Sequence, residues 1–188
     1  MKTIAKIFFV LGLGITTAFF SSGFEVNRTV AAEGGKTIIL YYSWSGNSAA
    51  IAKEIQRSTG GELLQIEPVT PYPAQYNACL AEARKEAGED RDRPLKTVFP
   101  TFAPGMTAYV CFPIWNGTIP TPIITMFRQN SFDGVHIMPV ASHGGGGAGR
   151  STAHIRSLAP GTTVTEALAV RGKALPSNFD EWVSANIK

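Results

Sequence analysis

The chain has 188 residues, of which 44% are hydrophobic and 16% are charged, and this balance excludes an intrinsically disordered protein. Its length is typical of one domain with a sizeable hydrophobic core. The formal net charge is only +3 and no cluster of Lys and Arg stands out, so the sequence predicts no nucleic-acid-binding surface.

The N-terminal segment has the pattern of a secretory signal peptide. Lys2 and Lys6 give it a positive start, and residues 7–20 form an apolar run shorter than the ~20 residues of a membrane-spanning helix. Val30 and Ala32 supply the small residues expected before a cleavage site that follows Ala32. The stretch before that site is long for a signal peptide, so an uncleaved N-terminal anchor is the alternative.

This pattern predicts two parts, a signal peptide or anchor at 1–32 and a globular domain at 33–188. The domain is expected to be exported, to the periplasm or the extracellular space, and to be a monomer. The first segment carries a net charge of +2, so the domain alone has a net charge of +1. Contact with a membrane is expected only if the first segment stays attached.

Strand-like and helix-like segments alternate along the rest of the chain. Residues 36–43 form an apolar run, whereas Ile51 and Ile55 recur at helical spacing in the segment that follows. The alternation continues to the C-terminus, where Ser177 or Asn178 can cap the last helix. In chain order the predicted elements are strand 36–43, helix 45–59, strand 62–69, helix 74–88, a long excursion 89–106, strand 108–115, helix 120–130, strand 135–142, helix 149–159, strand 162–170 and helix 176–187.

Five strands that alternate with helices predict an α/β fold with a parallel sheet covered on both faces. Ligands of such sheets bind beyond the carboxyl ends of the strands, where the strand order reverses. Three loops at carboxyl ends are unusual in composition, namely 43–48, 113–117 and 142–149. In the strand order 2-1-3-4-5 these loops are neighbours, so we expect them to form one site.

The first loop combines three hydroxyls with a glycine. Ser43, Ser45 and Ser48 can donate hydrogen bonds, and Gly46 allows close approach of a ligand. We expect the next helix to start at about Ser45, where its free N–H groups and its dipole attract an anion. A nucleotide-binding P-loop would place a Lys here, and its absence favours a phosphomonoester held by neutral donors. The alternative is a polar turn capped by Ser45.

The other two loops bring an aromatic ring and a run of glycines. Trp115 beside Gly117 suits a flat ligand and a close backbone contact, although a Trp that packs on a surface turn is the alternative. Four consecutive glycines follow His143, and their cost in chain entropy indicates backbone that lies against a ligand. His143 can donate to that ligand or hold the turn through backbone carbonyls.

Other interpretations of the glycine loop are weaker. His143 and the glycines are similar to an esterase oxyanion loop, but the chain has no G-x-S-x-G nucleophile elbow. Residues 144–149 fit the dinucleotide pattern G-x-G-x-x-G, yet four glycines in a row fit it almost automatically, and they follow the fourth strand rather than the first.

The cysteines, histidines and acidic residues suggest no second site. Export permits a disulfide, but the predicted positions of Cys79 on a helix and Cys111 in a strand favour two buried thiols. His136 and His154 are assigned to packing or to the surface, and no metal-ligand spacing is found. One group of acidic residues is interpreted as a solvated face, with a role in docking as the alternative, namely Glu82, Glu86, Glu89, Asp90 and Asp92.

Together the three loops resemble those of the flavodoxins, in particular a bacterial branch of flavodoxin-like proteins. "SWSGNS" is similar to the FMN phosphate loop, "PIWNG" to the loop beside the flavin ring, and "HGGGGAGR" to the glycine loop after the fourth strand. The resemblance covers about residues 36–172. It implies a flavodoxin-like three-layer sandwich with a five-stranded parallel sheet, non-covalent FMN, and electron transfer with a redox partner protein of unknown identity. The implied cofactor-binding residues are Ser43, Trp44, Ser45, Gly46, Asn47, Ser48, Pro113, Ile114, Trp115, Asn116, Gly117, Ser142, His143, Gly144, Gly145 and Gly147.

The chain also departs from that pattern. Asn116 stands where the branch usually has a second Trp, so Trp115 and Trp44 are the rings left to stack on a flavin. The chain is not acidic, unlike most flavodoxins, and it has an export signal. Two alternatives to an electron carrier therefore stay open, an FMN-dependent NAD(P)H:quinone-type reductase and a flavodoxin-like binding module without flavin.

Overall fold

The computed structural model describes residues 35–185. The predicted signal peptide or anchor at 1–32 lies outside the described residues. Within 35–185 no helix has both the length and the apolar character that crossing a membrane requires.

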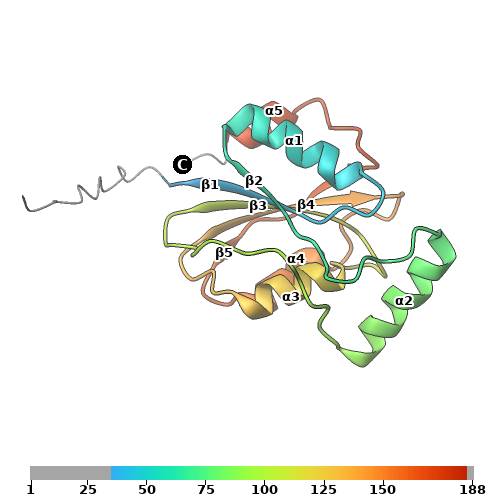
Figure 1. The fold of residues 1–188 in the computed structure, drawn as a ribbon. Helices are drawn as coiled ribbons and strands as arrows, with labels where there is room; N and C mark the ends of the chain where they lie inside the picture. The colour runs from blue at the N-terminus through green and yellow to red at the C-terminus, as the bar shows by residue number, and fades with distance from the viewer. Residues whose placement is uncertain (1–34, 186–188) are drawn as a thin grey trace, which may run out of the picture. The chain divides into compact units, whose positions relative to one another are not determined.

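One six-stranded parallel sheet forms the centre of the domain (Figure 1). Its order is β2-β1-β3-β4-β5, as the sequence predicted, and β6 pairs with β4. Every pair of neighbouring strands is parallel. The strands are β1 (Thr37–Tyr41), β2 (Glu62–Gln65), β3 (Thr107–Pro113), β4 (His136–His143), β5 (Thr163–Val164) and β6 (Leu168–Arg171).

Helices cover both faces of this sheet, so the predicted three-layer sandwich is confirmed. Helices α1 (Asn47–Thr59) and α5 (Phe179–Ser184) lie on one face, and α3 (Thr121–Gln129) and α4 (Ser151–Leu158) lie on the other (Figure 1). Successive side chains of a strand point to opposite faces. The central strand β3 therefore serves both layers.

Two hydrophobic clusters follow from this alternation. Tyr109 and Cys111 of β3 belong to the cluster that includes Ile51 of α1. Val110 and Phe112 belong to the cluster under α3 and α4. Both cysteines, Cys79 and Cys111, are free and buried, as the sequence predicted.

Helix α2 (Tyr76–Glu89) has a different position from the other four. It projects past the carboxyl ends of the strands instead of lying on a face of the sheet (Figure 1). A long connection returns from its end to the start of β3. Helix α2 is therefore placed beside the edge of the sheet where ligands bind in this class of fold.

The predicted fifth strand at 162–170 is two strands in the structure. Thr165 still donates its backbone N–H to Ile137 of β4 at 3.1 Å. The N–H of Ala167, however, goes to the hydroxyl of Thr152 on α4, at 3.0 Å. That side-chain acceptor interrupts the ladder, and pairing with β4 resumes only at Leu168.

The predicted second strand at 62–69 ends earlier, at Gln65. Beyond it, Glu67 donates its N–H to the hydroxyl of Thr97 at 2.7 Å, and Val69 donates to the carbonyl of Pro94 at 2.8 Å. From Glu67 on, the hydrogen-bonding neighbour of this segment is therefore the connection that follows α2, and no longer β1. The last helix is also shorter than predicted and begins at Phe179, although Asn178 does occupy its N-cap position, without a side-chain cap bond.

Tyr109 makes stability depend on pH at the alkaline end. It has no exposed surface, and burial, with a smaller contribution from Cys111, raises the pKa of its phenol from 10.0 to about 12. The unfolded chain loses this proton above pH ~10, whereas the folded chain keeps it until about pH 12. The unfolding free energy should therefore fall through this window, by about 1.4 kcal/mol per pH unit from this group.

Tyr109→Phe removes that contribution, so its unfolding free energy should fall less steeply between pH 10 and 12. Urea denaturation at several pH values measures the two slopes. Burial also raises the pKa of Tyr42 and Tyr72. The parent protein and the variant both contain these residues, so they contribute equally to the two slopes. Equal slopes would contradict the assignment to Tyr109.

Candidate functional site

The three loops singled out in the sequence meet at a cavity of about 530 Å³ at the carboxyl ends of β1, β3 and β4. This size suits a ligand of cofactor dimensions. Ten of the sixteen predicted site residues line it: Trp44, Ser45, Asn47, Pro113, Ile114, Trp115, Asn116, Ser142, His143 and Gly144. The other six lie in the same three loops without lining the cavity: Ser43, Gly46, Ser48, Gly117, Gly145 and Gly147.

The first loop differs in one detail from its prediction. Helix α1 starts at Asn47, and Gly46 is its N-cap with φ of +88° and no side-chain cap. The prediction that Ser45 caps this helix is therefore wrong. Ser45 is instead exposed, lines the cavity and makes no hydrogen bond to the described part of the chain. The hydroxyl of Ser43 is buried and also lacks a partner there.

Ser48 joins the first loop to the third. Its hydroxyl lies 3.0 Å from the hydroxyl of Ser142, and both residues are buried. Ser48 is on the first turn of α1, and Ser142 is near the end of β4. This bridge fixes the distance between the two loops behind the wall of the cavity.

The loop after β3 is held by aromatic contacts. Trp115 lies edge to face with Tyr42 and Tyr72, at ring-centroid distances of 5.6 and 4.9 Å. Asn116 and Gly117 make an exposed turn with positive φ. Trp115 is therefore a fixed wall of the cavity, and Asn116 is its exposed rim.

A close backbone approach joins this turn to the glycine loop. The carbonyl of Gly117 accepts a hydrogen bond from the N–H of Arg150 at 2.8 Å. A Cβ at Gly149 would lie 2.2 Å from that carbonyl oxygen, so only glycine fits there.

The glycine loop is shaped by His143. The Nδ1 atom of His143 accepts hydrogen bonds from the N–H groups of Gly145 and Gly147, at 3.0 and 3.2 Å. Of the two predicted roles the structure shows the structural one, although the imidazole accepts from N–H groups rather than donating to carbonyls. The neutral ring then carries its proton on Nε2, and His143 lines the cavity. Apart from the adjacent residues, no atom of residues 35–185 lies within 4 Å of a Cβ built at Gly144 or Gly146, so packing does not explain these two glycines.

Helix α2 supplies the part of the wall that the loop prediction missed. Four of its residues line the cavity, and Arg171 and Gly172 follow from the end of β6. The rule that ligands bind at the carboxyl ends of strands could have indicated Arg171 and Gly172. The hydrophobic periodicity of α2 predicts a helix but does not indicate where that helix lies. The α2 residues are Tyr76, Cys79, Leu80 and Ala83. Burial, followed by the charge of Glu82, raises the pKa of the Cys79 thiol, which therefore stays protonated.

Trp44 lines the cavity and is held by the segment before α2. Its indole N–H donates to the carbonyl of Pro73 at 2.9 Å, and its ring lies 6.3 Å from that of Tyr76. Both aromatic residues line the cavity, and Tyr76 is exposed. Trp44 of the first loop and Tyr76 of α2 thus give the cavity an aromatic surface from two separate parts of the chain.

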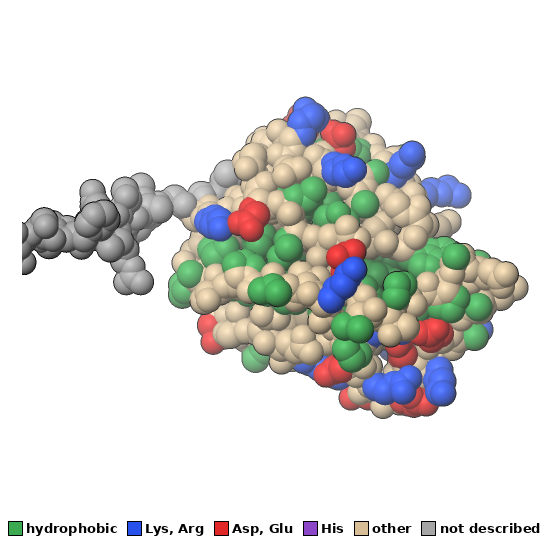
Figure 2. Space-filling model, viewed as in Figure 1, with side chains coloured by type: hydrophobic (Ala, Val, Ile, Leu, Met, Phe, Trp, Pro, Cys, Tyr) green, Lys and Arg blue, Asp and Glu red, His purple; other side chains and the backbone are tan. Residues whose placement is uncertain are grey.

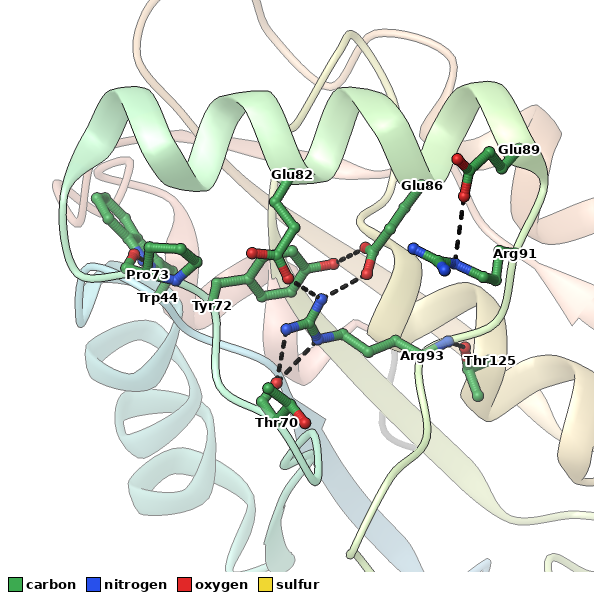
Figure 3. Close-up of polar contacts among 10 residues, drawn as sticks. All are labelled: Trp44, Thr70, Tyr72, Pro73, Glu82, Glu86, Glu89, Arg91, Arg93 and Thr125. Atoms are coloured by element: carbon green, nitrogen blue, oxygen red, sulfur yellow. Dashed lines mark hydrogen bonds and ion pairs between the residues drawn. The ribbon is translucent and has the colours of Figure 1, made fainter.

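A buried polar cluster fastens α2 in place (Figure 3). We call this cluster the Arg93 clamp. The guanidinium of Arg93 donates hydrogen bonds to the carbonyl of Thr70 at 2.6 and 3.0 Å and to Glu82 at 2.6 Å. It also pairs with Glu86, which accepts a hydrogen bond from Tyr72. The Arg93 backbone N–H donates to Thr125 of α3 at 2.9 Å. The clamp thereby joins α2, the two connections around it and α3.

The clamp corrects the interpretation of the acidic residues. Glu86 is only 4% exposed and Arg93 only 5%, so Glu86 does not belong to a solvated face. Burial opposes the charge on Arg93, but hydrogen bonds to Glu82 and Glu86 outweigh it and raise the pKa of the guanidinium. The other acidic residues of the group, Glu82, Glu89, Asp90 and Asp92, remain at least partly exposed.

Tyr72 connects the clamp to the cavity. The Arg93 guanidinium lies 3.6 Å from the centre of the Tyr72 ring, which in turn contacts Trp115. Burial, followed by the bond to Glu86, raises the pKa of the Tyr72 phenol, so it remains a donor. The wall formed by Trp115 therefore depends on the same contacts that hold α2.

The surface carries no large area of one charge on the face shown in Figure 2, where acidic and basic side chains alternate. Within residues 35–185 no group of three or more His, Cys, Asp or Glu is arranged to hold a metal ion. The polar groups that line the cavity are hydroxyls, carboxamides, the thiol of Cys79, the imidazole of His143 and the guanidinium of Arg171.

Arg93→Met should lower the unfolding free energy by about 3–5 kcal/mol, because it leaves Glu86 charged and buried without its cation. Denaturant titration measures the loss. Adding Glu86→Gln should recover part of it, since the uncovered charge is then gone.

Arg91→Met is the matched control, because Arg91 forms only an exposed ion pair with Glu89 at 3.4 Å. Its cost should stay below about 1 kcal/mol. If Arg93→Met costs no more than this control, the clamp does not stabilise the fold.

The fold also occurs in proteins of known structure. A candidate flavoprotein from Bacteroides uniformis is 24% identical with a TM-score of 0.71, covering 80% of this chain and 99% of its own. A similar protein from Bacteroides eggerthii is 22% identical with a TM-score of 0.65, covering 81% and 95%. A Lactobacillus acidophilus flavoprotein in complex with FMN is 21% identical with a TM-score of 0.62, covering 79% and 99%. At these identities the likeness establishes the fold.

No functionally curated protein matches the chain. The model of the flavodoxin family, however, matches residues 36–186, which is most of the chain and includes all three loops of the cavity. The chain therefore belongs to the flavodoxin family.

Proposed function

We propose that the chain binds one FMN non-covalently in the cavity of about 530 Å³ and acts as an electron carrier. The observation that supports this most directly is the meeting of the three loops at a cavity of cofactor size. Membership of the flavodoxin family supports the same cofactor, and the flavoprotein from Lactobacillus acidophilus was crystallised in complex with FMN.

The first loop fits a phosphate group. The N–H groups of residues 45–49 donate to no acceptor in the described chain, as expected at the start of a 13-residue helix. Ser45 adds an unpartnered hydroxyl, and the loop 43–48 contains no Lys or Arg. These residues would hold a phosphate by neutral donors, leaving its negative charge uncompensated.

The middle of the cavity fits a flat ring. Ile114, Leu80 and Ala83 give it apolar walls, and Trp115 and Trp44 add aromatic ones. FMN would supply the redox chemistry, while the protein orients the ring and controls its surroundings. The carbonyl of Asn116 accepts no hydrogen bond from the described residues, so it is available to a donor at the edge of the ring.

We also propose that residues 1–32 direct export and are removed after Ala32, on the basis of the signal-peptide pattern. The carrier would then exchange electrons with a partner protein outside the cytoplasm. The protein purified from its native cells should begin at Glu33, and an N-terminus at Met1 in N-terminal sequencing would show an uncleaved anchor.

Ser45→Ala should lower the affinity for FMN by about tenfold to a hundredfold, because it removes one hydrogen bond to a charged group. Riboflavin, which has no phosphate, should bind the variant as it binds the parent protein. The stability of the protein without ligand should not change, because Ser45 is exposed and caps nothing. Calorimetry with both ligands and a urea titration test these three expectations.

Ser48→Ala provides the contrast within the same loop. It leaves the buried hydroxyl of Ser142 without a partner and should cost about 1–3 kcal/mol of stability. Equal weakening of FMN and riboflavin by Ser45→Ala would mean that the first loop is not the phosphate site.

An electron carrier should not oxidise NAD(P)H by itself. The protein loaded with FMN is therefore expected to keep its oxidised flavin absorbance when NADPH is added, and to lose it when dithionite is added. Rapid bleaching by NADPH with turnover on quinones would establish the reductase alternative instead. A colourless protein that takes up no FMN would establish the binding module without flavin.

A further inference from the structure

A second cavity, of about 450 Å³, adjoins the first. The two share three wall residues, Ala83, Trp115 and Asn116. The second contains no residue of the phosphate loop or the glycine loop 142–149; its other walls come from the end of α2, from α3 and from α4. Its size is within the range of small-molecule sites, and the proposed FMN site does not account for it.

The negative charges of this cavity are already neutralised within the protein. Glu86 is bound by Arg93 and Tyr72 in the clamp (Figure 3). Asp90 pairs with Arg128 at 2.6 Å. Neither carboxylate is therefore free to repel an anion or to attract a cation.

One positive charge remains. Arg91 pairs with Glu89, and Arg128 pairs with Asp92 as well as Asp90. Arg150 also lines the cavity, and its guanidinium forms no ion pair or hydrogen bond with any described residue. An anion in this cavity would find its counter-charge at Arg150.

His154 lies beside that charge. Its Nδ1 is 3.0 Å from the hydroxyl of Thr118. Burial first, and then the charges of Arg128 and Arg150, lower the pKa of His154. The imidazole is therefore neutral, and the two guanidiniums act on it from α3 and from α4.

The remaining lining is apolar and aromatic. It comes from α2, from α3 and the segment that leads into it, and from α4. The residues are Ala83, Ala87, Trp115, Ile119, Pro120, Ile124 and Ala153. A ligand therefore needs an apolar body in addition to its charge.

We propose that the second cavity binds a small organic anion with an apolar body, whose charged group pairs with Arg150. This site is distinct from the proposed FMN site and shares Trp115 and Asn116 with it. A ligand bound there would touch the same residues that border the flavin ring.

Naphthalene-2-sulfonate and its uncharged analogue 2-naphthalenemethanol test the proposal by calorimetry, with saturating FMN present. The sulfonate should bind about fivefold more tightly than the alcohol, the upper range for one solvent-exposed ion pair. Arg150→Gln should remove this preference and leave the affinity for the alcohol unchanged. Arg84→Gln, which alters an exposed arginine of α2 outside both cavities, should keep it.

Ala153→Leu fills the cavity without changing its charge and should weaken both probes. The sulfonate should also raise the pKa of His154, which NMR can measure. The proposal is overturned if FMN abolishes sulfonate binding, since the probe then occupies the first cavity, or if Arg150→Gln keeps the preference. FMN binding is measured separately, so its failure would end the carrier proposal without affecting this one.

Discussion

The position of β1 between β2 and β3 is the constraint on which the site depends. β1 pairs in parallel with both neighbours, so the chain leaves it toward β2 on one side and reaches β3 on the other. Tyr41 is in register with Cys111, and the N–H of Tyr42 still donates to the carbonyl of Cys111 at 3.0 Å. The loops after β1 and β3 therefore start side by side. The side-by-side placement of these two loops follows from this register, because a shift of one residue would move every side chain of the shifted strand to the opposite face of the sheet.

That register leaves one wall open, and α2 closes it at the cost of burying charge. A helix outside the sandwich has little apolar surface to hold it, and the Arg93 clamp takes over that role. Buried ion pairs often add little net stability compared with hydrophobic residues of similar volume, but they restrict geometry because each partner needs its counterpart. Arg93 contacts Thr70, Glu82 and Glu86 at once, so few positions of α2 satisfy all of its bonds. The clamp thus fixes α2 as a wall of both cavities.

The sequence predicted the layers, the strand order and the three loops, because hydrophobic periodicity and glycine clusters are local signals. It failed where a partner distant in sequence decides the structure. Glu86 resembles an exposed helix residue until Arg93 and Tyr72 surround it, and the interruption near Ala167 depends on the hydroxyl of Thr152. Ser45 was predicted as a cap from its residue type, yet Gly46 adopts a left-handed conformation that ends the loop without a side-chain bond. The burial of Glu86 and the interruption near Ala167 cannot be read from neighbours along the chain, whereas the cap at Gly46 is a local outcome that residue type alone did not decide.

Asn116 connects the two cavities in one further respect. It stands where the resemblance to flavodoxin-like proteins implies a second Trp. Asparagine tolerates the positive φ of +50° found here better than most residues do. Asn116 lines both cavities, and a larger indole at the same position would take up room that its carboxamide leaves open. Trp115 cannot fill that space, since Tyr42 and Tyr72 hold it edge to face from the other side, at about 0.5–1.5 kcal/mol for each aromatic pair. Under the two proposals, the residue that removes one stacking surface from the flavin ring would be the same residue that leaves room for a second ligand beside it.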